Sequence, residues 1–138
     1  MSGNKNIILV MGKPATGKSA SLMNLPQESM VYLNTDLKEL PFRDRFKVNQ
    51  EVSLATSMES YIAEIEKQPD VTGAVLDTLT FLMSMYQRQV VANAVNTMKA
   101  WGEYGDFYRN LIHAIKSGSK NYAIMAHEES FLNEQTAQ

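Results

Sequence analysis

Residues 12–19, with the sequence GKPATGKS, constrain the fold of this chain more than any other stretch. They fit the pattern G-x-x-x-x-G-K-[ST] at every fixed position. The apolar run NIILVM, residues 6–11, precedes them, and residues 18–25 have helical character until Pro26 ends the helix. A glycine-rich turn from a buried strand into a helix predicts a parallel sheet in an α/β fold.

Such a turn can bind phosphate for a physical reason. Gly12 and Gly17 let successive backbone N–H groups point inward, and the helix that follows presents its positive N-terminus to the same point. Lys18 would reach the β- and γ-phosphates, and the Ser19 hydroxyl would ligate Mg²⁺. An ordinary glycine turn is the alternative. We predict that this loop binds ATP and Mg²⁺ through Gly12, Lys13, Pro14, Ala15, Thr16, Gly17, Lys18, Ser19 and Ala20.

The composition indicates one globular domain over residues 1–138. Apolar residues make up 44% of the chain and charged residues 20%, near the average for folded proteins. The absence of cysteine excludes disulfides, thiolate metal sites and a cysteine nucleophile, and two histidines cannot build a zinc site alone. No apolar run approaches membrane-spanning length, so we expect a cytoplasmic protein without a membrane partner.

The charge balance limits how the chain could contact nucleic acid. Its formal net charge of −2 argues against binding by bulk electrostatics, so any contact must come from a local patch. The candidate patch consists of the basic residues Lys38, Arg43, Arg45 and Lys47. The acids Glu39 and Asp44 lie among them, and this mixture of charges favours a solvated charged loop over a nucleic-acid site.

Further strands are predicted at residues 30–36, 72–80 and 122–126, with a short strand around residues 46–48. Each longer strand ends in polar residues. The apolar part of the strand at 72–80 ends at Asp77. Because helices separate these strands, we expect a parallel sheet with helices on both faces.

Two helical regions follow the second predicted strand. In residues 58–68, Met58, Ile62 and Ile65 recur at helical spacing, after a capping-box pattern formed by Thr56 and Glu59. Residues 81–117 are predicted to be mostly helical, and Gly118 is suited to end this helix. The paired glycines of WGEYGD, residues 101–106, predict a break in this second region.

Asp77 is the natural partner of a phosphate-bound metal ion. An acid directly after a buried strand can hold Mg²⁺ through its water shell, as the second Walker motif does. A strand-end turn or a helix cap is the alternative role for this residue. With a phosphate loop on a neighbouring strand, we favour the metal role and assign Ser19 and Asp77 as the metal residues.

These motifs together resemble a known ATPase core. In many AAA-type ATPases a catalytic glutamate follows the metal aspartate, whereas Thr78 follows Asp77 here. The loop, VYLNTD, AVLDTLTFL and YAIMAHEE, in this order, resemble RecA-like P-loop ATPases, particularly short phage-encoded versions linked to recombination and single-strand annealing. The stretch WGEYGDFYRNLIHAI is similar to a helix of those proteins. The resemblance spans nearly all the chain and, if a phage encodes it, implies the host cytoplasm.

The resemblance implies a role for five residues. Lys18 and Ser19 match the phosphate and magnesium residues. Asp77 matches the second Walker acid, and Asp36 the acid that orients the attacking water. His127 falls where the family has a polar sensor of the γ-phosphate, although a structural hydrogen-bonding role is the alternative. Asp36 is one methylene shorter than the usual glutamate, so slow hydrolysis would follow. The family's sheet continues with at least one more strand, whereas this sequence ends soon after the fourth long strand. We therefore expect either a truncated form or a minimal one whose sheet edge a partner covers.

The functional expectation is a Mg-dependent ATPase that assembles as a homo-oligomer on single-stranded DNA. A basic residue of a neighbouring subunit often assists such sites, and Arg88, Arg109 and Lys120 are the candidates. A small-molecule kinase and a non-hydrolysing, nucleotide-dependent scaffold are the alternatives. A GTPase is disfavoured, because the chain has no N-K-x-D element to recognise guanine. Core packing or adenine stacking is favoured over DNA stacking for Phe81, Tyr86 and Trp101.

Overall fold

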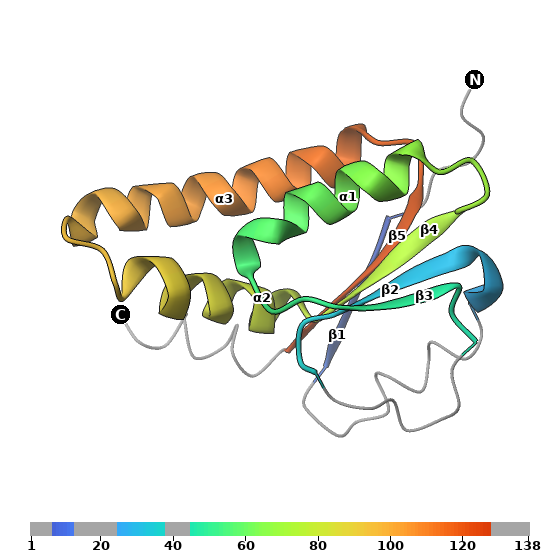
Figure 1. Ribbon diagram of the computed structural model, residues 1–138, viewed down its shortest axis with the longest axis horizontal. Helices are drawn as coiled ribbons and strands as arrows, with labels where there is room; N and C mark the ends of the chain where they lie inside the picture. Colours follow the sequence, from blue (N-terminus) through green and yellow to red (C-terminus); the bar gives the residue numbers. More distant parts are fainter. Residues whose placement is uncertain (1–6, 13–24, 38–44, 128–138) are drawn as a thin grey trace.

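The structure, a computed structural model, describes residues 7–12, 25–37 and 45–127. Its centre is a five-stranded sheet in which every pairing is parallel and the strand order is β1-β5-β4-β2-β3 (Figure 1). The sheet confirms the predicted α/β fold. The strands are β1 Ile7–Gly12, β2 Met30–Asn34, β3 Val48–Glu51, β4 Gly73–Asp77 and β5 Asn121–His127.

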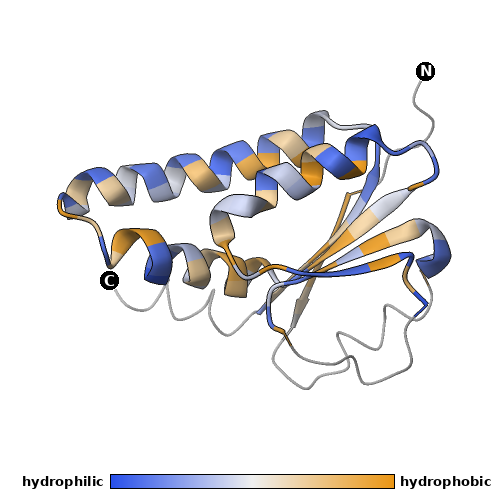
Figure 2. Cartoon of the chain, viewed as in Figure 1, coloured by the Kyte–Doolittle hydropathy of each residue, from blue (hydrophilic) through white to orange (hydrophobic). Residues whose placement is uncertain are grey.

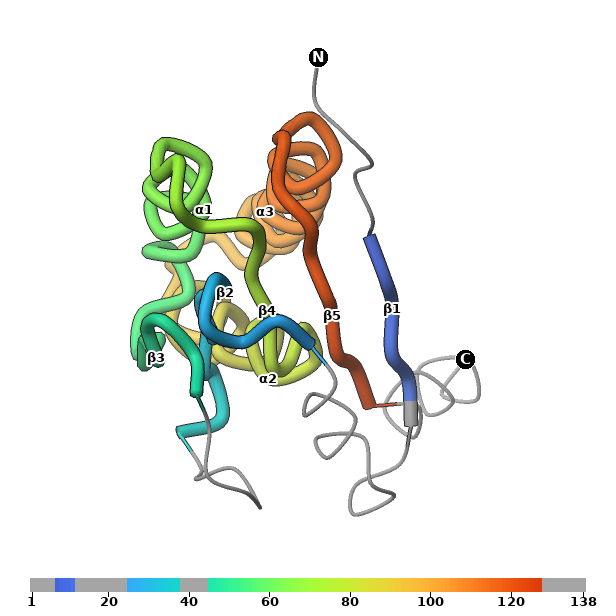
Figure 3. The backbone as a smooth tube through the Cα atoms, turned by 90° about the vertical axis from the view of Figure 1, so that its right-hand side faces the viewer, coloured from blue at the N-terminus to red at the C-terminus, as the bar shows by residue number. Residues whose placement is uncertain are grey.

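Three α-helices cover one face of this sheet (Figures 1 and 3). Alternate residues of the central strands, such as Leu33, Leu76 and Ile124, point to this face and pack with apolar residues of all three helices. Along α1 and α3, hydrophobic and hydrophilic residues alternate in the way an amphipathic helix requires (Figure 2). These helices are α1 Met58–Lys67, α2 Leu79–Tyr86 and α3 Thr97–Ser117. None of the helices in the described ranges is long and apolar enough to cross a membrane.

The opposite face of the sheet carries a smaller apolar cluster. Tyr32 and Phe46 stack there with their ring centroids 5.0 Å apart. Leu25, the first residue described after the predicted phosphate loop, packs against the same cluster. The helix predicted for residues 18–25, which would cover this face, lies almost entirely outside the described residues. The other members are Met30, Val75, Ala123 and Met125, with Val10 packed against them.

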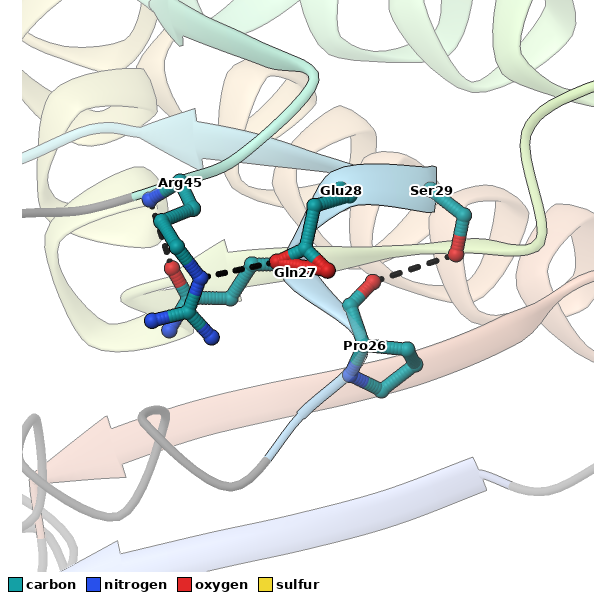
Figure 4. A network of polar contacts seen from close by, with 5 residues as sticks. All are labelled: Pro26, Gln27, Glu28, Ser29 and Arg45. Carbon is teal, nitrogen blue, oxygen red and sulfur yellow. Dashed lines mark hydrogen bonds and ion pairs between the residues drawn. The ribbon is translucent and has the colours of Figure 1, made fainter.

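Backbone and side-chain contacts fasten the start of β2 to the segment before β3 (Figure 4). Gln27 is fully buried, and its Oε1 accepts a hydrogen bond of 2.7 Å from the Arg45 N–H. Arg45 also forms an ion pair of 2.8 Å with Glu28. These contacts bring residues 45–47 beside β2 and allow Phe46 to stack on Tyr32.

The predicted break at residues 101–106 is wrong, because α3 continues through both glycines. Its apolar face extends on both sides of them, from Ala100 to Phe107, Leu111 and Ile115, so packing outweighs the helix-weakening effect of glycine. The interruption lies earlier, between the π-helical turn Gln87–Val91 and α3. Asn96 caps α3 there, and its Oδ1 accepts a hydrogen bond of 3.1 Å from the Lys99 N–H.

Two smaller expectations also need correction. The short strand predicted around residues 46–48 is β3, Val48–Glu51, because it pairs with β2 only from Val48 onward. The capping box of Thr56 does not form. A 3₁₀ turn, Ala55–Ser57, occupies this position, and Ser57, the N-cap of α1, makes no side-chain capping bond.

At the amino edge of the sheet, Glu66 of α1 binds the turn between α3 and β5. Its Oε1 accepts hydrogen bonds from the Ser119 N–H at 2.7 Å and the Ser119 hydroxyl at 3.1 Å. The hydroxyl of Tyr122 donates to Glu66 Oε2 at 2.7 Å. Burial alone would raise the pKa of Glu66, but these hydrogen bonds outweigh burial and hold the pKa below its ordinary value. Burial and the bond to Glu66 raise the pKa of Tyr122.

Gly73 and Gly102 should respond in opposite directions to substitution by alanine. A Cβ on Gly73 would collide with the backbone carbonyl of Asn121 on the neighbouring strand, whereas nothing lies near a Cβ on Gly102. We expect Gly73→Ala to lower the free energy of unfolding by on the order of 1–3 kcal/mol. Gly102→Ala should raise it by about 0.5–1 kcal/mol, because alanine favours an exposed helix. Denaturant unfolding measures both, and equal effects would contradict the register of β4 on β5.

The lowered pKa of Glu66 makes a pH-dependent contribution to stability. A carboxyl group whose folded pKa is depressed stabilises the fold above its unfolded pKa, and this stabilisation is lost as the pH falls through the folded value. We therefore expect Glu66→Gln to lower the free energy of unfolding by about 1 kcal/mol at pH 7, and the difference from wild type to shrink in acid. Urea titrations at several pH values test this. Glu64→Gln, on the exposed side of the same helix, is the control and should have little effect at any pH.

Candidate active site

The carboxyl ends of all five strands lie at one edge of the sheet, because every pairing is parallel. Gly12 at the end of β1 is opposite His127 at the end of β5. Asp77 at the end of β4 lies between Met125 of β5 and Asn34 of β2. In open α/β sheets, ligands bind at this edge. The tertiary structure thus brings Gly12, His127 and Asp77 to the same edge.

Asp77 is a buried carboxylate, with 6% of its surface exposed. The Tyr32 hydroxyl donates a hydrogen bond of 2.5 Å to its Oδ2. Within the described ranges, no basic side chain forms an ion pair with it. A buried carboxylate held by one neutral donor is costly unless a cation compensates its charge. The donor set therefore suits a hard divalent cation.

Thr35, in the segment after β2, holds the backbone around Asp77. Its N–H donates to the Asp77 carbonyl at 2.9 Å, which extends the β2–β4 pairing by one residue. The Thr35 hydroxyl accepts from the Thr78 N–H at 2.8 Å and lies 2.9 Å from the Asp77 carbonyl oxygen. The peptide bond between Asp77 and Thr78 is cis. The Asp77 carbonyl and the Thr78 N–H, on either side of this peptide bond, therefore both have hydrogen-bond partners.

His127 contacts the start of α2. Its backbone N–H donates to Thr80 Oγ1 at 2.9 Å, and its ring meets Phe81 edge-on with a centroid distance of 5.3 Å. Thr78 caps α2 by accepting a hydrogen bond from the Phe81 N–H at 3.1 Å. His127 is therefore joined through α2 to the chain that directly follows Asp77. Both roles proposed for it, sensor and structural hydrogen-bonder, agree with this position.

Asp36 follows Thr35 at the same edge and is half-buried. The turn that carries it is shaped by Asn34, whose Oδ1 accepts a hydrogen bond of 2.8 Å from the Leu37 N–H. Leu37 has a φ of 59°, in the left-handed region that a leucine rarely adopts. The hydrogen bond from Asn34 helps to hold this conformation and so restricts the backbone that positions Asp36.

The remaining predicted loop residues lie outside the described residues. Gly12 is the last residue of β1 and stands where the loop is expected to begin. The other predicted ligands, Lys13, Pro14, Ala15, Thr16, Gly17, Lys18, Ser19 and Ala20, fall in the segment that the structure does not describe. Their roles in phosphate and metal binding stay predictions.

The basic patch proposed for nucleic acid is partly engaged in ion pairs. Arg45 binds Glu28, and Lys47 lies 2.8 Å from Asp70. Lys38 and Arg43 lie outside the described ranges. These pairs leave less free positive charge for a polyanion and agree with a solvated charged loop.

The candidate basic residues for a subunit boundary lie at different places on the chain. Arg88 is exposed on the π-helical turn, and Arg109 is exposed on α3, where it pairs with Asp106. Lys120 lies at the amino edge of the sheet, where it donates to the Gln68 carbonyl at 2.7 Å. Lys120 therefore lies at the opposite end of the strands from the candidate site.

The three aromatic candidates differ in burial. Tyr86 is buried and stacks on Phe107 with a centroid distance of 4.5 Å, as expected for core packing. Phe81 packs against His127. Trp101 remains 47% exposed on α3 and touches Tyr104. Of these three aromatics, only Trp101 is exposed and free to contact a ligand or partner from its helix surface.

The carboxyl edge of the sheet resembles a magnesium site that has few protein ligands. In the described part of the chain, no three acidic, histidine or cysteine side chains gather into a metal cluster. Mg²⁺ usually keeps several waters and takes one or two protein oxygens together with substrate phosphates. A single buried carboxylate at the edge that also carries Gly12 fits this chemistry.

A parallel sheet with a glycine-loop pattern after one strand and a buried acid at the same edge defines an α/β nucleotide-binding domain of the P-loop ATPase type. Residues 4–138 match the family model described as an AAA domain, and the chain belongs to this family. No curated protein matches the sequence significantly.

Sequence reasoning missed two residues that shape the site, Tyr32 and Thr35. Both belong to VYLNTD, in which only the terminal acid matches a motif of the family. A tyrosine hydroxyl in an otherwise apolar strand is a signal that it needs a buried partner. That partner follows only from the register, which places Tyr32 opposite Val75, two residues before Asp77.

Thr35→Val should destabilise the protein by removing the hydroxyl between Asp77 and Thr78. The substitution leaves the buried Thr78 N–H without its acceptor, which costs on the order of 1–3 kcal/mol in the free energy of unfolding. Thr35→Ser retains the hydroxyl and is the matched control. Chemical denaturation of the three proteins measures the difference. A valine variant as stable as wild type would show that the Thr35 hydroxyl does not hold this strand end.

Proposed function

We propose that this protein binds Mg-ATP at the carboxyl edge of its sheet and hydrolyses it slowly. The observation that carries the proposal is the buried Asp77 carboxylate at the edge where Gly12 begins the predicted phosphate loop. Membership of the AAA domain family supports nucleotide binding and ATPase-type chemistry. Lys18 and Ser19 would complete the site through the loop motif.

The residues would divide the work of hydrolysis. The loop N–H groups and Lys18 would bind the phosphates, while Ser19 and Asp77 would hold Mg²⁺. When bound, the ion would neutralise charge on the phosphate oxygens. Asp36 would orient the attacking water and accept its proton. Its side chain is one methylene shorter than glutamate, and this supports slow turnover.

Single-stranded DNA is the proposed stimulating partner. The order of the motifs, which resembles that of phage recombination and annealing ATPases, supports this partner. A homo-oligomer would allow Arg88 or Arg109 of one subunit to reach the nucleotide of the next. Both arginines are exposed, which supports such a role.

A nucleotide-dependent scaffold is the second candidate, and β1 favours it. Among the described strands, β1 lies at one edge of the sheet and exposes apolar side chains, including Ile8 at 50% and Leu9 at 57%. Exposed apolar edge strands pair readily with other chains. A scaffold would bind Mg-ATP without turnover and recruit a partner through this strand.

Mg-ATP hydrolysis with and without single-stranded DNA tests the proposal. We expect turnover to rise with DNA, and Lys18→Ala to abolish it because the phosphates lose their charge partner. Asp36→Asn should lower turnover by about 100-fold while nucleotide affinity stays near that of wild type. Glu51→Gln removes an exposed acid at the end of β3 on the same edge and is the matched control, expected to behave as wild type.

Each negative result removes a different part of the proposal. An ATP hydrolysis rate that is the same with and without DNA would exclude the recombination role, and the protein would then be an ATPase that DNA does not stimulate. Mg-ATP binding with no turnover in any condition would favour the scaffold. Transfer of phosphate to a small acceptor instead of water would identify a kinase.

A further inference from the structure

Tyr32 is the residue whose side chain hydrogen-bonds to the carboxylate of Asp77 within the described ranges. It is 2% exposed on the central strand β2, and its hydroxyl reaches across to β4, where it donates to Asp77 Oδ2 at 2.5 Å. Val75 lies opposite Tyr32 in the register, so the tyrosine side chain reaches two residues along β4 toward the carboxyl edge to contact Asp77. The contact is therefore built by the β2–β4 pairing and not by local sequence.

The ring of Tyr32 has little freedom to move the hydroxyl elsewhere. Phe46 stacks on it at an interplanar angle of 20°, and Phe46 itself is held by the bonds of its neighbours Arg45 and Lys47 to Gln27. Met30, Val75 and Met125 complete the apolar surroundings. The hydroxyl is thus presented to Asp77 by packing, as a positioning group requires.

The two oxygens of Asp77 differ as a result. Oδ2 accepts the hydroxyl proton of Tyr32, whereas Oδ1 accepts no hydrogen bond from the described residues. We propose that Tyr32 is a positioning residue that holds Oδ2 and directs Oδ1 to the magnesium ion. This inference rests on the proposed function and adds a residue to its metal site. Outer-shell donors of this kind orient a ligand and tune its basicity.

Tyr32→Phe tests the inference, because it keeps the ring and its stacking on Phe46 and removes only the hydroxyl. The readout is the Mg²⁺ dependence of binding of a fluorescent ATP analogue, measured without turnover. We expect the Mg²⁺ concentration at half-saturation to rise by about 10-fold, while binding of the analogue in excess EDTA is unchanged. A half-saturation within twofold of wild type would overturn the inference.

Tyr122→Phe is the matched control. Tyr122 is also 2% exposed, and its hydroxyl also donates to a carboxylate, Glu66, but at the amino edge of the sheet. A general loss of stability from a missing buried hydroxyl would therefore appear in both variants. Only Tyr32→Phe should change the Mg²⁺ response, and an equal change in Tyr122→Phe would overturn the positioning role.

A double-mutant cycle with Asp77→Asn separates action through Asp77 from any other effect. If Tyr32 works through this carboxylate, Tyr32→Phe adds no further loss of Mg²⁺ affinity to Asp77→Asn. Additive losses would overturn the inference. If Tyr32→Phe fails to fold, Phe46→Leu, which loosens the ring and retains the hydroxyl, should also raise the half-saturation concentration, and an unchanged value would count against the proposal.

The wild-type control distinguishes the two proposals. If wild-type protein binds the analogue without any dependence on Mg²⁺, the proposed function fails and the positioning role fails with it. If the wild type depends on Mg²⁺ and Tyr32→Phe responds identically, the ATP site stands and only the role of Tyr32 is rejected.

Discussion

In the parallel pairing of β2 with β4, Asn34 lies opposite Asp77, and the Thr35 N–H adds one more bond beyond the last paired residues. The contacts of Tyr32 and Thr35 with the end of β4 depend on this register. A shift by one residue would turn every side chain of β2 to the other face of the sheet. Tyr32 would then face the helices, and the Asp77 carboxylate would lose its described donor.

Burial makes the Asp77 carboxylate useful and costly at once. Removal from water strengthens its attraction for a cation, but an isolated buried charge is unfavourable. The Tyr32 hydroxyl meets part of this cost. The proposed magnesium ion would supply the positive charge that this neutral donor lacks.

The two faces of the sheet differ in the apolar clusters that they carry. Helices α1, α2 and α3 bury one face and form the larger core, while the other face carries the cluster of Tyr32 and Phe46 beneath the Asp77 carboxylate. Leu25 packs on this second face, just after the predicted phosphate loop. The chain thus separates the surface that stabilises the domain from the surface that holds the candidate metal ligand.

Local patterns in the sequence determined the class of fold and most of its elements. Alternation of apolar strands with helices such as Met58–Lys67 predicted the α/β architecture, and polar strand ends singled out Asp77 and His127, whose roles stay predictions. These features are visible because they depend on neighbours in the chain. The break predicted at Gly102 and Gly105 failed for the complementary reason, since packing of α3 against the core outweighs local helix propensity. The strand order and the contacts of Tyr32 and Thr35 were decided only by the tertiary structure, because each joins residues whose partners are set by strand register and packing.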